Sequence, residues 1–136
     1  MAARIPDSHR DLLENPVVVA LTTIMPDGQP QATPVWCLYD GTHIIINTAR
    51  GRQKDQNMQQ NPKVAILAID PKNPYRYLEI RGEVDEATEE GGVEMINRLS
   101  ERYTGRRDYY AGNPQMRGKE RRVTYKIRPT HVVASG

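Results

Sequence analysis

The sequence has one cysteine, one tryptophan and no phenylalanine among its 136 residues. A single Cys37 excludes a disulfide within the chain, which is typical of a protein from a reducing compartment. No apolar run approaches the roughly 20 residues that a helix needs to cross a bilayer. The first segment, MAARIPDSHRDLL, lacks the apolar core of a secretory signal. We therefore expect a cytoplasmic protein with no membrane partner.

The chain also lacks a large charge of either sign. Its formal net charge is +2, which argues against a general nucleic-acid binder. The charge is uneven, because residues 117–128 carry six bases and one acid, whereas residues 85–94 carry five acids and no base. A locally basic face favours a small acidic ligand over bulk DNA. We expect a small-molecule ligand and no nucleic acid.

Recognisable catalytic and metal-binding motifs are missing as well. The histidines His9, His43 and His131 are far apart and have no ligand-spaced acidic or cysteine neighbours, so we expect no metal site. There is no glycine-framed serine elbow, P-loop or dinucleotide fingerprint, and no residue is singled out as catalytic. Cys37 lies in an apolar segment and is expected in the core. If the chain is an enzyme, a bound cofactor would carry the chemistry.

What the chain does contain is a series of β-branched or alternating segments separated by turns. The predicted strands are Val17–Ile24, Gln31–Tyr39, Thr42–Thr48, Lys63–Ile69, Arg76–Asp85 and Arg121–Val133. Pro34 cannot donate to a sheet ladder, so its strand is expected at an edge or opening toward a ligand. Gly82 inside the fifth strand indicates a bulge.

One substantial helix is predicted over Thr88–Tyr103, with Thr88 as its N-cap, and the polar segment Gly105–Gly118 is predicted to be a loop. The last strand predicts a core face and a solvated basic face, the basic face carrying Arg122, Thr124, Lys126 and Arg128. About six antiparallel strands and one main helix indicate a mainly β protein. We expect a single domain over residues 1–136, forming a closed or nearly closed barrel.

The stretch Arg50–Pro62, RGRQKDQNMQQNP, indicates a ligand site between two predicted strands. Arg52 and Lys54 carry a guanidinium and an ammonium, which both suit phosphate oxygens. Gly51 can adopt a backbone conformation that other residues avoid, and a helix beginning near Arg52 would add free N–H groups. We interpret this stretch as a phosphate site at a strand-to-helix junction. The alternative is a solvated basic loop that caps a short surface helix.

Several motifs follow one another in a characteristic order along the chain. A Pro-Asp-Gly turn at 26–28 precedes Thr33-Pro34-Val35-Trp36, and Arg52-x-Lys54-x-x-Asn57 and Asn61-Pro62 follow the third strand. This order resembles the FMN-binding, pyridoxamine 5′-phosphate oxidase-like split β-barrel family. With the C-terminal pattern from Arg121-Arg122-Val123 to Pro129-Thr130-His131-Val132, it is most similar to the deazaflavin reductases that use coenzyme F-420. Authentic pyridoxamine phosphate oxidases end in a strand that contains Trp and Arg, which this sequence does not have.

The resemblance implies a homodimer with the cofactor in a groove between the subunits. The residues expected at the cofactor are Thr33, Pro34, Val35, Asn47, Thr48, Ala49, Arg52, Lys54, Asn57 and Tyr77. Arg52 and Lys54 would hold the phosphate, and Asn57 would support that segment. Residues 33–35 would follow the ring edge, and residues 47–49 would line the other side. Tyr77 would either reach the ring across the dimer or pack in the interface.

The implied activity is that of an oxidoreductase. Reduced deazaflavin coenzyme F-420 would deliver a hydride to an electron-poor double bond of a small organic substrate. The alternatives are an FMN-binding flavoprotein of the same fold and a non-catalytic carrier of flavin or deazaflavin. The basic side chains of Lys126 and Arg128 would meet either the polyglutamate tail of the coenzyme or solvent.

Overall fold

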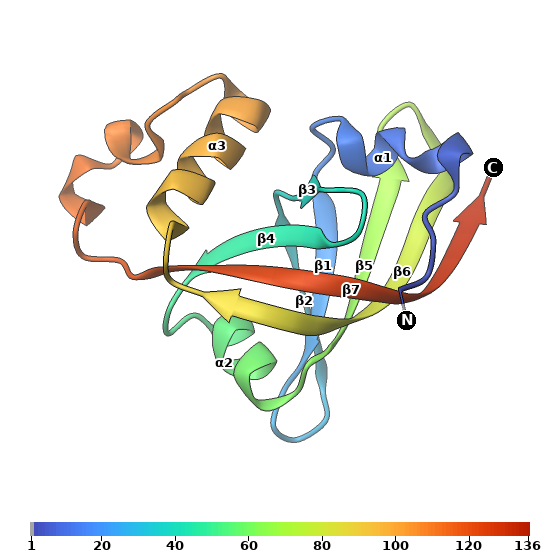
Figure 1. The fold of residues 1–136 in the computed structure, drawn as a ribbon, viewed down its shortest axis with the longest axis horizontal. Helices are drawn as coiled ribbons and strands as arrows, with labels where there is room; N and C mark the ends of the chain where they lie inside the picture. The colour runs from blue at the N-terminus through green and yellow to red at the C-terminus, as the bar shows by residue number, and fades with distance from the viewer. Residues whose placement is uncertain (1) are drawn as a thin grey trace.

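Seven antiparallel strands form one curled sheet in the order β2-β1-β5-β6-β7-β4-β3 (Figure 1). The computed structural model describes residues 2–136. The strands are β1 Val19–Ile24, β2 Pro30–Val35, β3 Leu38–Tyr39, β4 Ile44–Ala49, β5 Lys63–Asp70, β6 Asn73–Thr88 and β7 Arg122–Ser135. The helices are α1 Asp11–Glu14, α2 Gln53–Gln60 and α3 Gly92–Thr104, with short 3-10 turns at Asp7–His9, Tyr109–Gly112 and Pro114–Met116. This arrangement confirms the expected mainly β split barrel.

The predicted second strand, Gln31–Tyr39, is two strands in the structure, which raises the number from about six to seven. β2 pairs with β1 at one edge of the sheet, and β3 pairs with β4 at the other. The chain therefore crosses from one edge to the other at Trp36-Cys37, and this crossing brings the two edges together. Pro34 lies in the edge strand β2, opposite Ala20, as its missing N–H predicts.

The interior of the curled sheet is a cluster of mainly aliphatic side chains, which also contains Cys37, Met58 and Tyr125. The fully buried side chains include Leu21, Ile46, Ile66, Ile80 and Ile127. Each such side chain contributes about 1.5–3 kcal/mol when it leaves water. Side chains along a strand point alternately to its two faces, and these residues are on the inward face, as the alternation of apolar residues in the sequence predicts.

The bulge predicted at Gly82 is confirmed by a register shift between Arg81 and Gly82 in the pairing of β6 with β7. A Cβ at residue 82 would lie 2.8 Å from Ile127 Cγ2 and 2.9 Å from the Arg128 carbonyl oxygen. Glycine is therefore required by the close approach of the two strands.

Helix α3 begins later than predicted, because β6 continues pairing as far as Thr88 opposite Thr124. The predicted N-cap role of Thr88 is therefore wrong; its Oγ1 accepts a hydrogen bond from the Glu90 N–H at 3.1 Å in the connecting turn. Gly91, with a φ of +72°, is the residue before the helix. In Figure 1, α3 lies above the paired strands β4 and β7, and α2 lies below them.

The prediction that one face of β7 is solvated and basic is wrong for part of the strand. Arg122 and Thr124 are buried, at 4% and 5% exposure, because α3 and β4 pack on this end of the strand. Farther along, Lys126 pairs with Glu86 at 3.3 Å, and Arg128 pairs with Glu83 and Asp85, both at 3.1 Å. Acidic side chains of the neighbouring strand β6 therefore neutralise much of the basic charge.

The predicted loop Gly105–Gly118 contains the two 3-10 turns at Tyr109–Gly112 and Pro114–Met116, and Tyr110 within it is 2% exposed.

None of the helices within residues 2–136 is long and apolar enough to span a bilayer. In the same range, no three His, Cys, Asp or Glu side chains form a group suited to a metal ion.

The contact between α3 and β7 predicts a large effect of Gly92→Ala. A Cβ at residue 92 would lie 2.5 Å from the Arg122 carbonyl oxygen and 2.9 Å from its carbon, which are both backbone atoms. We expect a loss of about 1–3 kcal/mol in the free energy of unfolding, because the helix must move away from the strand. Urea denaturation measures it, with Gly112→Ala as the control, since a Cβ there meets only the mobile end of the Arg106 side chain. Equal stability of both variants would contradict this packing.

Candidate functional site

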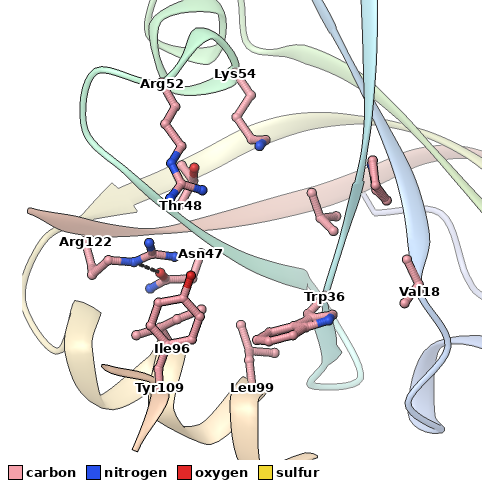
Figure 2. A pocket seen from close by; sticks show the side chains of 12 residues that line it. Val18, Trp36, Asn47, Thr48, Arg52, Lys54, Ile96, Leu99, Tyr109 and Arg122 are labelled. Carbon is pink, nitrogen blue, oxygen red and sulfur yellow. Dashed lines mark hydrogen bonds between the residues drawn. The ribbon is translucent and has the colours of Figure 1, made fainter. Parts of the chain in front are cut away.

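A cavity of about 390 Å³ lies between the ends of β2 and β4 and the helices α2 and α3 (Figure 2). One end is polar and carries Asn47, Thr48, Arg52, Lys54 and Arg122. The rest is apolar or aromatic and carries Val18, Pro34, Val35, Trp36, Ile96, Leu99 and Tyr109. Figure 2 shows Arg52 and Lys54 extending into the space from the start of α2, on the side opposite Trp36. The cavity thus suits a ligand with an anionic end and a flat or apolar body.

The two predicted phosphate-binding side chains come from the turn that begins α2. Gly51 has a φ of +93°, a conformation that L-residues rarely adopt, and Arg52 follows as the extended residue before the helix. A Cβ at residue 51 would meet nothing within 4 Å. Glycine is therefore needed here for its positive φ, and not because another group packs closely against it. The turn directs Arg52 and Lys54 to the same cavity.

The carboxylate of Asp55 holds this turn in place from inside the protein. Its Oδ2 accepts the Gly51 N–H at 2.9 Å, and its Oδ1 accepts Arg50 Nη1 at 2.9 Å and the Tyr125 hydroxyl at 2.6 Å. Asp55 is 1% exposed. Burial raises the pKa of Asp55, but the hydrogen bonds from Tyr125, Gly51, Gln59 and Arg50 outweigh it and lower that pKa below its usual value.

Arg122 forms part of the cavity wall and is the most enclosed cation there. Its side chain is 2% exposed, and its Nε donates to Asn47 Oδ1 at 2.8 Å while its Nη1 donates to Glu120 Oε1 at 3.1 Å. The guanidinium also lies over the Tyr109 ring, 5.2 Å from the centroid. The side chain is therefore fixed on three sides, with the fourth toward the cavity (Figure 2).

Lys54 differs from the two arginines, because within residues 2–136 it makes no ion pair with an acidic side chain. Burial lowers the pKa of Lys54, and repulsion by Arg52 and Arg122 lowers it further. An anion bound between these cations would relieve that repulsion. Lys54 is thus the cation of the cavity whose charge is most available to a ligand.

The structure brings six of the ten predicted cofactor residues to this cavity, namely Pro34, Val35, Asn47, Thr48, Arg52 and Lys54. Thr33 lies in a second, apolar groove on the outer face of β1 and β2, and Ala49 lies in a shallow hollow beside Arg50. Asn57 is on the buried face of α2, where its Nδ2 donates to Thr23 Oγ1 at 3.0 Å and its Oδ1 accepts Gln53 Nε2 at 2.8 Å. Tyr77 pairs with Ile69 and Ser135 and does not line the cavity of its own chain.

Other cavity residues were not identified from the sequence. Ile96, Leu99 and Tyr109 reach the cavity from α3 and from the segment that was predicted to be a loop. Arg122 was assigned to a solvated face. Asp55 was the only acid in the basic stretch and was therefore a detectable signal, since a single acid among bases often pairs with them.

The curled sheet with a cationic and aromatic cavity defines a split barrel that can bind an anionic ligand. Residues 5–135 match the pyridoxamine 5′-phosphate oxidase family. The chain therefore belongs to this family, as the sequence resemblance predicted.

The chain is also similar to several individual proteins. A pyridoxine/pyridoxamine 5′-phosphate oxidase from Rhodopseudomonas palustris (strain BisB5) is 33% identical over 84 residues, which are 61% of this chain and 39% of that protein. The matched part thus spans about two fifths of that relative. Among solved structures, an F-420 reductase is 35% identical with a TM-score of 0.82, covering 95% of this chain and 98% of that one. A conserved hypothetical protein from Mycobacterium tuberculosis is 26% identical with a TM-score of 0.74, covering 98% and 86%.

The buried hydrogen bonds of Asp55 predict a pH-dependent effect of Asp55→Asn. Because the pKa of Asp55 is lower in the folded than in the unfolded protein, its carboxylate stabilises the fold above about pH 4. That contribution is lost as the pH falls through the folded-state pKa. We expect the variant to lose about 1–3 kcal/mol of unfolding free energy at pH 7 and less at pH 3.

Urea denaturation at both pH values measures this difference. Asp7→Asn is the matched control, since the Asp7 side chain is 72% exposed and its ion pairs are long, at 3.5 and 3.7 Å. A loss in Asp55→Asn that is the same at pH 3 and pH 7 would show that the carboxylate charge does not contribute.

Proposed function

We propose that the protein is an oxidoreductase that transfers a hydride from reduced deazaflavin coenzyme F-420 to an electron-poor double bond of a small organic substrate. The observation that carries this proposal is the cavity, with two cations from the start of α2, Arg52 and Lys54, at one end and aromatic side chains at the other. The likeness to an F-420 reductase over nearly the whole length of both chains supports the deazaflavin over other cofactors.

The polar end of the cavity fits a phosphate group. Within residues 2–136, the Arg52 guanidinium donates to Glu120 through Nη2 alone, which leaves its other N–H groups for a ligand. Lys54 adds an ammonium without an acidic partner. Thr48 Oγ1 is buried and has no hydrogen-bond partner in the same range, although Thr48 lines the cavity. A ligand oxygen would satisfy this hydroxyl, because buried polar groups are rarely left unpaired.

The aromatic end of the cavity fits the edge or face of a flat ring. Trp36 stacks on Tyr103 with their centroids 5.5 Å apart and meets Tyr109 edge-on at 6.2 Å. The Tyr103 hydroxyl donates to the Val17 carbonyl oxygen at 2.7 Å and accepts the Cys37 N–H at 3.2 Å, which fixes the cluster. A rigid aromatic wall loses little conformational entropy when a ring packs on it.

In this proposal the bound cofactor supplies the hydride chemistry. The chain's own residues bind and orient the cofactor, with Arg52 and Lys54 at its phosphate and Val35 and Asn47 beside its body. The apolar side chains of Ile96 and Leu99 exclude water from the same space. No residue in the cavity is assigned a proton-transfer step.

An FMN-binding flavoprotein is the second candidate, because FMN needs the same phosphate contacts and the chain belongs to the pyridoxamine 5′-phosphate oxidase family. Lys126 and Arg128 were one reason to expect coenzyme F-420, because their positive charges could bind its polyglutamate tail. Both side chains form salt bridges with acids of β6, so they do not favour coenzyme F-420 over FMN. A carrier that binds the cofactor without turnover is the third.

The visible spectrum of the purified protein, followed by titration with both cofactors, tests the proposal. We expect a colourless protein that binds coenzyme F-420, and reoxidation of the bound reduced coenzyme when electron-poor alkenes are added. A co-purified yellow flavin, with no deazaflavin binding, would support the FMN alternative instead. Binding of the deazaflavin without reoxidation by any acceptor would favour the carrier.

Lys54→Ala tests the phosphate end of the cavity directly. The substitution removes a charge-assisted hydrogen bond, so we expect cofactor affinity to fall about tenfold or more while the fold remains intact. Calorimetric titration measures the affinity, and thermal unfolding checks the fold. Lys63→Ala is the control, because Lys63 is an exposed lysine in β5 and does not line the cavity. Unchanged affinity in Lys54→Ala would exclude Lys54 from the cofactor site.

We further propose that two copies of the chain pair through the outer face of β1, β2 and β5. This face carries an apolar groove of about 340 Å³, and Val18 and Ile69 on it are 54% and 42% exposed. Tyr77 shares the face, because it lies directly opposite Ile69 in the sheet register. Exposed apolar side chains at a sheet edge are typical of an interface, and a second copy offers a face of matching character. Across such an interface Tyr77 could approach the partner's cofactor.

Ile69→Glu tests this pairing. A charge in the middle of the apolar face should convert a dimer into a monomer. A stable interface covers roughly 1,000 Å² or more, and burying an unpaired carboxylate within it is strongly unfavourable. Light scattering at micromolar concentration measures the mass. Val93→Glu is the matched control, since Val93 is 41% exposed on α3, away from this face. A monomeric wild type that still binds the cofactor tightly would refute the dimer.

A further inference from the structure

One carboxylate, that of Glu120, connects two of the cations that line the cavity. Its Oε2 accepts Arg52 Nη2 at 3.0 Å, and its Oε1 accepts Arg122 Nη1 at 3.1 Å and the Tyr110 hydroxyl at 2.8 Å. The side chain is 12% exposed and comes from the segment between the last 3-10 turn and β7. Glu120 does not line the cavity itself but lies behind the arginines.

Glu120 is needed because Arg122 is enclosed. A guanidinium that is 2% exposed and has no counter-charge would be strongly destabilising. Burial raises the pKa of Glu120, but the Tyr110 hydrogen bond and the charges of Arg122 and Arg52 outweigh it and lower that pKa below its usual value. The carboxylate is therefore ionised at neutral pH.

The charges around the cavity can be counted from these contacts. Three cations line it, Arg52, Lys54 and Arg122, and among residues 2–136 Glu120 is the acid that forms salt bridges with two of them. Three positive charges and one negative charge leave a sum of +2. Without Glu120 the same wall would carry +3.

We propose that Glu120 tunes which phosphate charge the cavity accepts, by weakening its preference for a doubly charged phosphomonoester relative to a singly charged phosphodiester. This inference rests on the proposed function, and it concerns the same phosphate end of the cavity. A phosphodiester joins the deazaflavin side chain of coenzyme F-420 to its tail, whereas FMN ends in a monoester. Glu120 would thus act through Arg52 as a positioning and specificity-determining residue.

The physical reason is repulsion at short range. A phosphate bound to the free N–H groups of Arg52 would share that guanidinium with Glu120, whose oxygen is 3.0 Å from Nη2. Each additional negative charge on the ligand is then repelled by the carboxylate. A carboxylate and a phosphate on opposite sides of one guanidinium are about 8 Å apart, where one unit of charge changes a binding constant by about twofold in water and about thirtyfold near a protein surface.

Glu120→Gln tests the proposal with two ligands that differ by one charge, FMN and its 5′-methyl phosphodiester. The glutamine retains an oxygen for Tyr110 and removes the charge. We expect the affinity for FMN to rise about threefold or more relative to the affinity for the methyl ester. Titration at pH 8 measures both affinities, since FMN is then a dianion and its methyl ester a monoanion.

Two control variants separate charge from structure. Tyr110→Phe removes the hydrogen bond to Glu120 but keeps its charge, so the ratio of the two affinities should stay as in the wild type. Glu94→Gln removes the same charge from an exposed position on α3 and should also leave the ratio unchanged. If Glu120→Gln changes both affinities by the same factor, the charge of Glu120 does not select between the ligands, and the residue acts only on the structure of the site.

A smaller pair of probes makes the test independent of the cofactor. Inorganic phosphate and dimethyl phosphate at equal ionic strength differ in the same way, and the shift in thermal unfolding reports their binding. Glu120→Gln should be stabilised more than the wild type by both anions, and its gain should be larger with phosphate than with dimethyl phosphate. Failure of the wild type to bind any flavin or deazaflavin would refute the proposed function. An equal response of both proteins to the small anions would refute the role of Glu120.

Discussion

The pairing of β7 with strands on both of its sides is the constraint on which the site depends. β7 pairs with β6 along most of its length and with β4 over Arg122–Ile127. Because side chains alternate, Tyr125 enters the core and donates to Asp55, whereas Arg122 faces Asn47 and the cavity. One strand thus positions both the acid that shapes the turn before α2 and the arginine of the cavity wall. A slip of one residue would exchange these two faces.

The three basic side chains at the start of α2, Arg50, Arg52 and Lys54, have different environments, although they are close in sequence. Arg50 is held by Asp55 and Glu89, at 2.9 and 3.0 Å, and belongs to the structure of the turn. Arg52 shares one nitrogen with Glu120 and keeps the others free. Lys54 has no acidic partner within the described residues, and its lowered pKa reflects its burial first and the neighbouring cations second. Of these three bases, Arg50 therefore stabilises the turn, Arg52 is partly bound to Glu120, and Lys54 is free to bind a ligand.

The cavity and the apolar outer face are continuous, because Val18 and Pro34 line both. Pro34 suits this place, since it lies on an edge strand and lacks the N–H that another strand would pair with. In the proposed dimer, a second copy on the outer face would lie next to the opening of the cavity. Cofactor binding and assembly would then depend on the same few residues of β1 and β2.

Features that depend on neighbours along the chain could be predicted from the residues alone. These include the turns, the alternating core positions, the edge strand at Pro34, the bulge at Gly82 and the basic turn with Gly51 before α2. Contacts between distant segments, by contrast, place Thr88 at the end of a strand, bury Arg122, and bring Glu120 between Arg52 and Arg122. Arg52 and Glu120 are 68 positions apart. Local chemistry sets what each side chain can bind, whereas strand register and helix packing set which partner it meets.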